Sequence, residues 1–286
     1  PAHLYGKSYK TYPTKNIRIP IDKEIIKENK IVAEKDYDKI LDYIDWNVGF
    51  DRLEKKHMII IDMLANNNWE RPVYFAITIG NGPAAFMNLA DYLQLDGMVY
   101  KLVPIKNEAP IDGQLGSVNS DELYDNLMNK FSWGNMEDPD VYLDETNLRM
   151  TMNFRNNFSR LATQLVEEEK FDKAIEVLDE CMKRMPHERV PYNFFVLPIA
   201  ESYLMAGEKE KGTQLLNDLF SVYESELLYY TEFSIPKRRA FLTDDIKRAL
   251  YFCRTTYETA QVYRLDELGS DFKSRYESTI EKLKSE

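Results

Sequence analysis

Residues 80–85, Gly-Asn-Gly-Pro-Ala-Ala, come closest to a ligand-binding motif in residue type and spacing. A glycine turn between a strand and a helix offers free backbone amides to a phosphate or a carboxylate. However, Pro83 lacks one of those amides, and residues 101–103 contain no acidic side chain at the position that a dinucleotide site needs. We therefore expect an ordinary strand-to-helix turn here, with no nucleotide site and no bound cofactor.

Metal binding and nucleophilic catalysis find no support in the sequence. His3, His57 and His187 each lack a second histidine or cysteine at the spacing of metal ligands. Cys181 and Cys253 lie within expected helices and are typical of small buried apolar residues. No nucleophile has a recognisable local signature. We expect neither a metal site nor a catalytic residue in this chain.

A group of aromatic residues surrounds the most clearly predicted strand, residues 73–79, which is β-branched and aromatic and is bounded by proline and glycine. Tyrosine provides apolar area with a polar tip and so suits contact with a sugar or a peptide. The alternative is that these side chains are structural residues at the edge of the core. The candidate pocket residues are Trp69, Arg71, Tyr74, Tyr92 and Tyr100.

The net charge argues against two classes of partner. The chain has 37 basic and 48 acidic side chains and a formal net charge of −11, which suits neither nucleic acids nor an anionic membrane surface. The basic residues 236–239 are expected to form a solvated loop, with docking of an anionic partner as the alternative. The purely apolar run at residues 58–61 has four residues, far below the roughly 20 of a membrane span. No basic segment followed by an apolar one stands at the start of this sequence, so no signal peptide is expected within it.

Residues 1–131 are expected to form a small α/β module. Short extended segments are predicted at residues 17–21, 30–33 and 40–44, and Pro20 confines the first of them to an edge or an end of a sheet. Asp51 is expected to cap a helix that the three asparagines at 66–68 terminate. After the strand at 73–79, the pattern predicts a helix over 84–95 and a strand over 98–105.

The rest of the chain is nearly all helix and contains an internal repeat. Residues 132–152 are expected to be a linker and lead-in helix, and residues 153–286 a helical repeat domain. A shift of 38 positions aligns apolar residues, among them Phe158 with Val196 and Leu178 with Leu216. The pattern resembles the tetratricopeptide repeat, an antiparallel helix pair of about 34 residues, so the predicted fold class is α+β and mostly α. The small residues expected at helix crossings are Ala162, Ala174, Ala200 and Gly212.

The second copy of the repeat departs from the pattern at two points. Pro198 falls inside its first helix, which costs about 3 kcal/mol unless the helix kinks or begins there. The closing proline is absent, so the second helix can run on through Leu228. A third helix pair, over residues 243–263 and 265–283, has helical spacing without the signature and is expected to be a terminal cap.

A partner is expected to bind on the concave face of the repeats. In tetratricopeptide arrays the first helix of each pair lines that face, and polar residues beside an exposed phenylalanine and methionine suit an extended peptide. The alternative is that Phe194 and Leu197 pack against the long second helix. The repeat alignment places on this face Asn156, Ser159, Thr163, Glu167, Phe194, Leu197, Glu201 and Met205.

Two blocks, MLANNNWERPVYF at residues 63–75 and DYLQLDGMVYKLVP at 91–104, are similar to recurring blocks in a family of large bacterial membrane proteins. That family resembles the protein O-mannosyltransferases and is otherwise of unknown function. The resemblance covers essentially the whole chain and implies a parent with many membrane-spanning helices, followed by a soluble part with tetratricopeptide-like helices. It also implies a polyprenyl-phosphate-sugar-dependent glycosyltransferase whose catalytic acids lie in the membrane portion, so no catalytic residue is carried over to this chain.

The expected function is that of a non-catalytic soluble domain that binds a protein or peptide, such as a glycosylation substrate, next to a membrane glycosyltransferase. The implied location is the periplasmic or extracytoplasmic face of a bacterial membrane, attached to the membrane domain of the parent chain. Two alternatives stay open. One is a free-standing enzyme that uses a pocket near Gly80, Tyr92 and Tyr100, and the other is a structural brace for the membrane domain.

Overall fold

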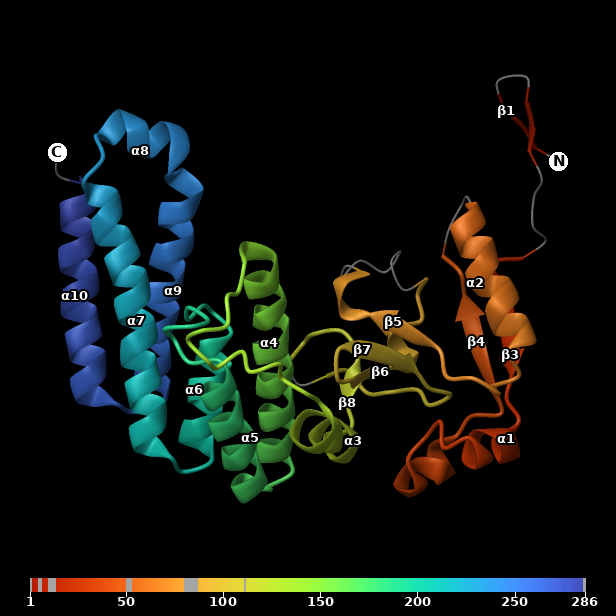
Figure 1. The fold of residues 1–286 in the computed structure, drawn as a ribbon. Coiled ribbons are helices and arrows are strands. Elements are labelled where there is room, and N and C mark those ends of the chain that lie inside the picture. The colour runs from red at the N-terminus through yellow and green to blue at the C-terminus, as the bar shows by residue number, and fades with distance from the viewer. Residues whose placement is uncertain are drawn as a thin grey trace. The chain divides into compact units, whose positions relative to one another are not determined.

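The computed structural model describes residues 2–4, 7–9, 14–49, 53–79, 87–110 and 112–284. The chain divides into two compact units, Pro1–Asn126 and Leu127–Glu286, and each is described by itself. Figure 1 shows short strands in the first unit and long helices in the second. The predicted α+β, mostly α fold class is confirmed. The turn at 80–85, the start of the helix predicted at 84, and Asp51 lie outside the described residues.

The first unit begins with two antiparallel pairs of short strands. β1 (Ala2–Leu4) pairs with β2 (Lys7–Tyr9), and β3 (Asn16–Pro20) pairs with β4 (Tyr43–Asn47) so that Ile19 lies opposite Ile44. Along β4, Ile44 and Trp46 are buried while their neighbours are exposed, which is the two-residue period of a half-buried strand. The strand predicted at 17–21 is confirmed as β3.

Of the two other extended segments predicted in this region, the one at 30–33 is wrong and the one at 40–44 is only partly confirmed. α1 (Lys23–Glu28) ends where Lys30 takes a φ of 49°, and a 3₁₀ helix follows over Glu34–Lys39. Ile31 and Val32 are therefore buried in a turn between two helices and form no strand. The strand predicted at 40–44 begins only at Tyr43, as β4, because the 3₁₀ helix extends to Lys39.

α2 (Lys55–Asn66) begins at a different cap from the one expected. Glu54 is its N-cap, and its backbone N–H donates to Nδ1 of His57 at 3.1 Å. At the other end Asn67 is the C-cap, and Asn68 follows with a φ of 46°, as predicted for the asparagine run. His57 therefore acts as a buried capping residue.

The second sheet of this unit has the strand order β5-β7-β6-β8. β5 (Tyr74–Ala76) and β6 (Leu93–Asp96) run antiparallel to β7 (Val99–Leu102), while β8 (Ser117–Val118) runs parallel to β6. The strands predicted at 73–79 and 98–105 are present but shorter. The first of them gives way to a 3₁₀ turn at Ile77–Ile79.

The helix predicted over 84–95 is wrong at its described end, where a 3₁₀ turn at Ala90–Tyr92 leads into β6. Leu93 and Leu95 are buried and the residues that follow each of them are partly exposed, which is the alternation of a strand. Gly97 then takes a φ of 63° as the first residue of the two-residue turn to β7. That position favours glycine in a hairpin, so Gly97 is the signal that marks β6 and β7 as paired strands.

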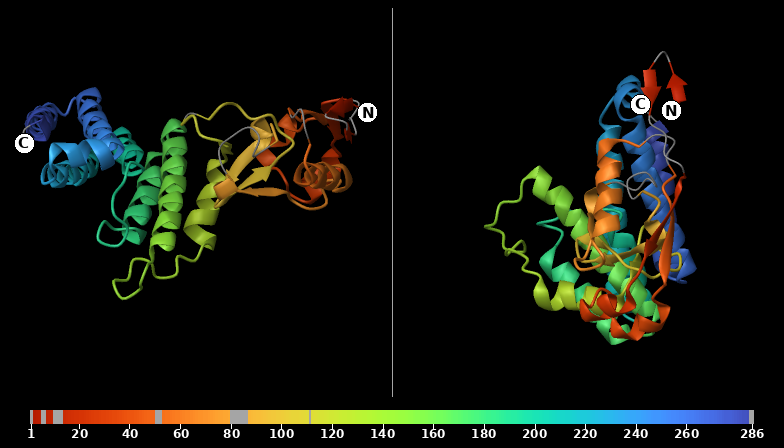
Figure 2. Two further views of the ribbon diagram at one scale, coloured as in Figure 1. Left: turned by 90° about the horizontal axis from the view of Figure 1, so that it is seen from above. Right: turned by 90° about the vertical axis from the view of Figure 1, so that its right-hand side faces the viewer.

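The second unit consists of helices that pack as neighbours. α3 (Ser120–Tyr124) closes the first unit, and a π-helical turn follows at Asp125–Lys130. The helices beyond it are α4 (Glu145–Glu167), α5 (Phe171–Arg184), α6 (Val196–Met205), α7 (Lys209–Thr231), α8 (Ile235–Phe241), α9 (Thr243–Val262) and α10 (Asp266–Lys284). Three pairs pack together, α4 with α5, α6 with α7, and α9 with α10, and α7 also packs against α9. Figures 1 and 2 show these helices side by side.

The helix pairs follow the predicted repeat in their cores. Ala162, Ala174 and Ala200 are fully buried, and Gly212 is buried as well. A Cβ added at Gly212 would lie 2.6 Å from Cγ of Leu204, so α6 and α7 approach each other closely at this point. Small residues thus stand where the repeat alignment expects helices to cross.

The helix ends also agree with the repeat alignment. Pro198 is the third residue of α6, within the first turn, where a backbone N–H has no partner in the helix. α7 continues past Leu228 to Thr231, and α9 and α10 form the predicted third pair. Pro198 is therefore tolerated in α6, because the helix begins only two residues earlier, at Val196.

The basic residues 236–239 lie in α8, so the prediction of a solvated loop is wrong. Pro236 occupies the first turn, where proline is favoured. Arg238 is buried, and its Nη1 donates to the carbonyl oxygen of Leu283 at 2.6 Å, near the end of α10. The guanidinium satisfies a terminal helix carbonyl while the side-chain stem packs against apolar surface.

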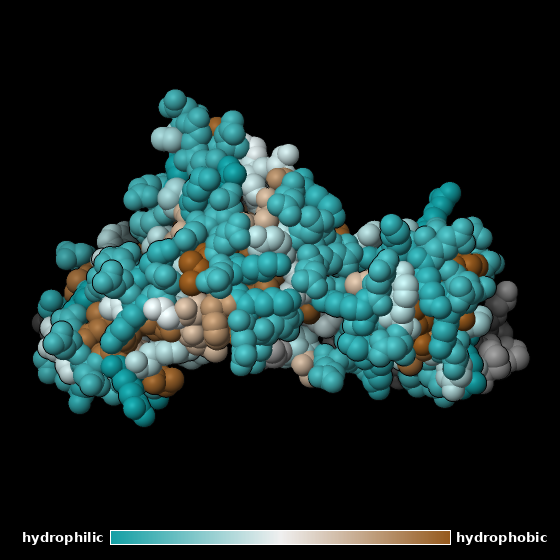
Figure 3. Space-filling model, turned by 90° about the horizontal axis from the view of Figure 1, so that it is seen from below, coloured by the Kyte–Doolittle hydropathy of each residue, from teal (hydrophilic) through white to brown (hydrophobic). Residues whose placement is uncertain are grey.

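None of the helices in the described residues is both long and apolar enough to cross a lipid bilayer. Figure 3 shows a face on which hydrophilic residues predominate and hydrophobic ones form small separate patches. Exposed large apolar side chains occur on several helices, among them Ile59 of α2, Phe241 of α8 and Val262 of α9. Scattered exposed side chains of this kind are normal on protein surfaces.

Candidate functional site

The two tyrosines at the centre of the predicted pocket do not converge. Across the β5–β7 pair, Tyr74 lies opposite Lys101 and Phe75 lies opposite Tyr100. Because side chains alternate along a strand, Tyr74 and Tyr100 point to opposite faces of the sheet. Tyr74 is 45% exposed, whereas Tyr100 is 7% exposed. A pocket shared by these two side chains is therefore excluded.

Trp69, Arg71 and Tyr92 have other roles as well. Trp69 is buried, and its Nε1 donates to the carbonyl oxygen of Pro20 at 3.3 Å. Arg71 is exposed, and its carbonyl oxygen accepts from the side-chain amide of Asn67 at 2.7 Å. Tyr92 ends the 3₁₀ turn before β6, and burial raises the pKa of its hydroxyl. The predicted common pocket is wrong because strand register and turn geometry, rather than proximity in sequence, decide which side chains converge.

A hollow of about 350 Å³ lies beside β6 and β8, and none of the five predicted pocket residues lines it. Asn107 holds its wall together, because its Nδ2 donates to the carbonyl oxygens of Asp91 and Leu93 and its Oδ1 accepts from Gln94. The charged groups that remain at the hollow are the carboxylates of Asp91 and Glu108. The hollow therefore offers a ligand little beyond two surface carboxylates.

A buried ion pair lies on the Tyr74 face of the sheet. Lys101 is 5% exposed, and its Nζ lies 2.8 Å from Oε1 of Glu122 in α3. Asn126 donates to the carboxylate of Asp96 nearby. Burial raises the pKa of Tyr74, and the carboxylates of Asp96 and Glu122 raise it further. Since Lys101 and Glu122 satisfy each other, the pair is suited to fixing α3 on the sheet.

In the helical unit, most of the α4 residues that the alignment assigns to the concave face are buried or contact neighbouring helices. Ser159 is 1% exposed, so its assignment to a binding surface is wrong; α5 and α6 pack against α4 and cover much of it. Oγ1 of Thr163 lies 3.4 Å from Oγ of Ser202 and links α4 to α6. Asn156 is partly buried, and Glu167 is exposed at the last residue of α4. α4 thus offers few free side chains to a partner.

The corresponding residues of α6 are more accessible. Phe194, just before the helix, is 44% exposed, and Met205, at its end, is 45% exposed. Leu197 and Glu201 lie between them and are partly exposed. Residues that recur every three or four positions share one side of a helix. These four residues, called here the α6 stripe, form an apolar row with one carboxylate in it.

Side chains of α9 face this stripe. The ring of Phe252 stacks on that of Phe194, with centroids 5.6 Å apart and planes 10° apart. The hydroxyl of Thr259 lies near the carboxylate of Glu201 and acts to lower its pKa. Together with the α6 stripe, Phe252 and Thr259 form what is called here the α6–α9 seam. Neither α9 residue can be identified from the repeat signature, because the third helix pair lacks it. The alternative prediction packs Phe194 against α7, whereas its ring stacks on Phe252 of α9.

The electrostatics of the seam centre on Glu201. Burial raises the pKa of its carboxyl group, and the nearby hydroxyl of Thr259 opposes that rise. The pKa of Tyr263, the C-cap residue just after α9, is also raised, first by burial and then by the charge of Glu201. The seam can therefore contact apolar groups and can accept hydrogen bonds or a positive charge at one point.

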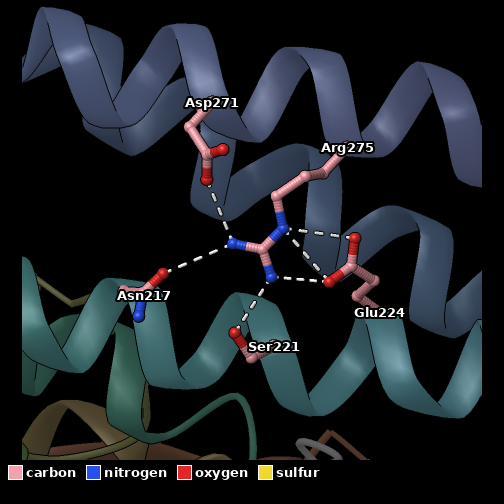
Figure 4. A network of polar contacts seen from close by, with 5 residues as sticks. All are labelled: Asn217, Ser221, Glu224, Asp271 and Arg275. Carbon is pink, nitrogen blue, oxygen red and sulfur yellow. Dashed lines mark hydrogen bonds and ion pairs between the residues drawn. The ribbon is translucent and has the colours of Figure 1, made fainter.

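A polar network between α7 and α10 is shown in Figure 4. Arg275 of α10 donates from Nη2 to Glu224 at 2.5 Å and to Ser221 at 3.0 Å. Its Nη1 donates to Asp271 at 3.1 Å and to Asn217 at 3.4 Å. With its donors directed at protein acceptors, Arg275 joins two helices and is structural.

The cysteines are poor candidates for covalent chemistry. Cys181 and Cys253 are free and buried, and burial raises the pKa of each thiol to about 12. Such thiols stay protonated at neutral pH and are weak nucleophiles. In the described ranges, no three His, Cys, Asp or Glu side chains are grouped as metal ligands would be. The geometry therefore supports non-covalent binding at the α6–α9 seam best.

Residues 2–122 match a family model described as TMEM260-associated domain 2. The match includes both of the sequence blocks at 63–75 and 91–104 and lies within the first unit. The first unit is thus similar to a domain associated with TMEM260, and the helical unit lies outside the match. No curated protein and no solved structure matches the chain.

Proposed function

We propose that this chain is the non-catalytic part of a membrane-anchored protein related to the protein O-mannosyltransferases, and that its helical unit binds a protein or peptide, such as a glycosylation substrate. The observation that carries the binding role is the α6 stripe, where Phe194 and Met205 remain 44% and 45% exposed. The stack on Phe252 holds one end of this row in place. Rigid aromatic contact area beside polar groups is typical of peptide-binding surfaces.

Two similarities support the membrane-anchored parent. The match to TMEM260-associated domain 2 covers residues 2–122, and both blocks that resemble the O-mannosyltransferase-like family lie inside that range. Glycosyl transfer by the parent and a periplasmic location are supported by the block resemblance. The coding sequence beside this stretch provides a check: a series of hydrophobic spans is expected, and a continuous hydrophilic reading frame would contradict the proposal.

The alternative of a free-standing enzyme with a pocket near Gly80, Tyr92 and Tyr100 has less support. Tyr100 is only 7% exposed, so its side chain is poorly placed to contact a substrate. The alternative of a structural brace differs from the proposal in one measurable respect. A brace contacts the parent's own membrane domain, so changes to the α6 stripe would leave peptide capture unaffected.

Selection from a phage library of random peptides tests the binding role on the 286-residue chain. The parent is compared with a Phe194→Ser, Met205→Ser double variant and with Tyr142→Ser, which removes an 85% exposed aromatic ring outside the helices. Each variant is first shown to unfold as the parent does. We expect the parent and Tyr142→Ser to enrich the same peptides, and the double variant to retain them roughly tenfold less well. Equal enrichment by all three proteins would contradict the proposal and favour the brace.

A further inference from the structure

Glu201 carries the one negative charge of the α6–α9 seam, and no lysine or arginine pairs with it among the described residues. α6 contains no other charged side chain. Across the seam lie the hydroxyl of Thr259 in α9, which acts to lower the pKa of Glu201, and the phenol of Tyr263 just after that helix. By contrast, Glu224 in the same unit is matched by Arg275 at 2.5 Å. The seam therefore holds a carboxylate whose charge the described residues leave uncompensated.

A partly buried carboxylate without a positively charged neighbour lowers the stability of the folded protein. A carboxylate that is partly removed from water loses hydration, and a single nearby hydroxyl replaces only part of it. An opposite charge brought beside it would restore the ionised form, and such a pair is stronger in a partly desolvated place than in bulk water. The neighbours along the stripe are apolar, with Phe194 toward one end and Met205 toward the other. The complementary ligand has a positive charge flanked by apolar groups.

We infer that Glu201 selects the partner, by pairing with a lysine or arginine side chain of an extended peptide while Phe194 and Met205 contact apolar side chains on either side of it. This inference rests on the proposed function, because it concerns the same surface. At about 1.5 Å per residue, Glu201 lies about 6 Å from Met205 along the axis of α6, and Phe194 lies just before the start of that helix. An extended chain rises about 3.3 Å per residue. The apolar residue of the peptide that contacts Met205 therefore falls about two positions from the basic residue, and the one that contacts Phe194 lies on its other side.

The test uses the same phage selection, now read for the composition of the enriched peptides. The parent is compared with Glu201→Gln and with Glu210→Gln, a matched control that removes an exposed acidic charge from the first turn of α7. The most enriched peptide is then synthesised with its basic residue and with norleucine or citrulline in its place. Calorimetry at neutral pH measures the dissociation constants of both peptides for all three proteins.

We expect the parent and Glu210→Gln to enrich lysine- or arginine-containing peptides and to bind them roughly tenfold or more tightly than the neutral counterparts. Glu201→Gln should lose that preference while still binding through the apolar residues. Peptides enriched without a basic residue, or an undiminished preference in Glu201→Gln, would overturn this inference and leave the proposed function intact. If the parent enriches no peptide above background, both the proposed function and this inference fail.

Discussion

Replacing Gly212 with alanine tests whether α6 and α7 cross as closely as the repeat requires. Gly212 is the fourth residue of α7. An added Cβ would lie 2.6 Å from Cγ of Leu204 and 2.9 Å from the carbonyl oxygen of Ala200, whereas ordinary contacts begin near 3.4 Å. The Leu204 side chain can rotate away, but the Ala200 carbonyl belongs to the backbone of α6. The clash is therefore relieved only if the two helices move apart.

Gly269 provides a matched control, since it is the fourth residue of the long helix α10. A Cβ there would lie 3.8 Å from Cγ of Gln261, which is an ordinary contact. Alanine is favoured over glycine in a helix by about 1 kcal/mol, so Gly269→Ala should stabilise the chain by up to that amount. At Gly212 the same gain is set against an overpacking cost of about 1–3 kcal/mol. We expect a net loss of about 1 kcal/mol for Gly212→Ala, and a difference of about 2 kcal/mol between the two variants.

Urea unfolding followed by far-ultraviolet circular dichroism measures both changes, and thermal unfolding should shift by about 2–4 °C per kcal/mol for a unit of this size. Gly212→Leu extends the series, because a longer side chain should cost more than alanine. If Gly212→Ala gains stability as Gly269→Ala does, the two helices do not approach closely at Gly212. A Gly212→Leu variant as stable as Gly212→Ala would likewise refute the overpacking argument.

Three further perturbations address charged and reactive groups. Arg275→Ala removes the guanidinium of the network in Figure 4 and should lower the free energy of unfolding by about 2–3 kcal/mol in urea titrations. Arg254→Ala breaks an exposed pair and should cost far less stability than Arg275→Ala, and equal losses for the two would show that the network adds nothing. Because burial raises the folded-state pKa of Glu201, its ionised form costs stability at neutral pH, and the cost vanishes as the pH falls below the ordinary value of 4.5. Glu201→Gln should therefore match or exceed the parent in stability at neutral pH and lose that advantage in acid; an advantage that grows in acid would contradict the sign. Cys181 and Cys253, with thiol pKa values raised to about 12, should resist a thiol reagent until the chain unfolds. Labelling of the folded chain at the rate of a free thiol would show that they are accessible.

Much of the helical unit could be predicted because its signals are local. The tolerance of Pro198 and the extension of α7 beyond Leu228 depend on residues within one or two helical turns, and the structure agrees with both predictions. The first unit was harder, since its strands are only two to five residues long. The pattern predicts a helix at residues 93–95 because short apolar runs fit either period, whereas pairing with β7 makes these residues a strand.

The candidate site could be predicted on α6 and not beyond it. The helical period tells which residues share a side, so Phe194 and Met205 could be chosen from the repeat alignment. The helical period gives the wrong exposure for Ser159, because it carries no information about which helices pack on α4. In the structure α5 and α6 cover that side of α4. Phe252 was missed because its contact with Phe194 depends on the packing of α9 against α7 rather than on a local pattern.

The sequence by itself determined the elements whose signals lie a few residues apart, such as the end of α2 at the asparagine run and the start of α6 before Pro198. Those features follow from dihedral preferences and short-range hydrogen bonds, which neighbouring residues decide among themselves. Only the tertiary structure decided which side chains meet. Strand register placed Tyr74 and Tyr100 on opposite faces, and helix packing brought Thr259 to Glu201. Such contacts join residues far apart in the chain, and their geometry depends on every element packed between them.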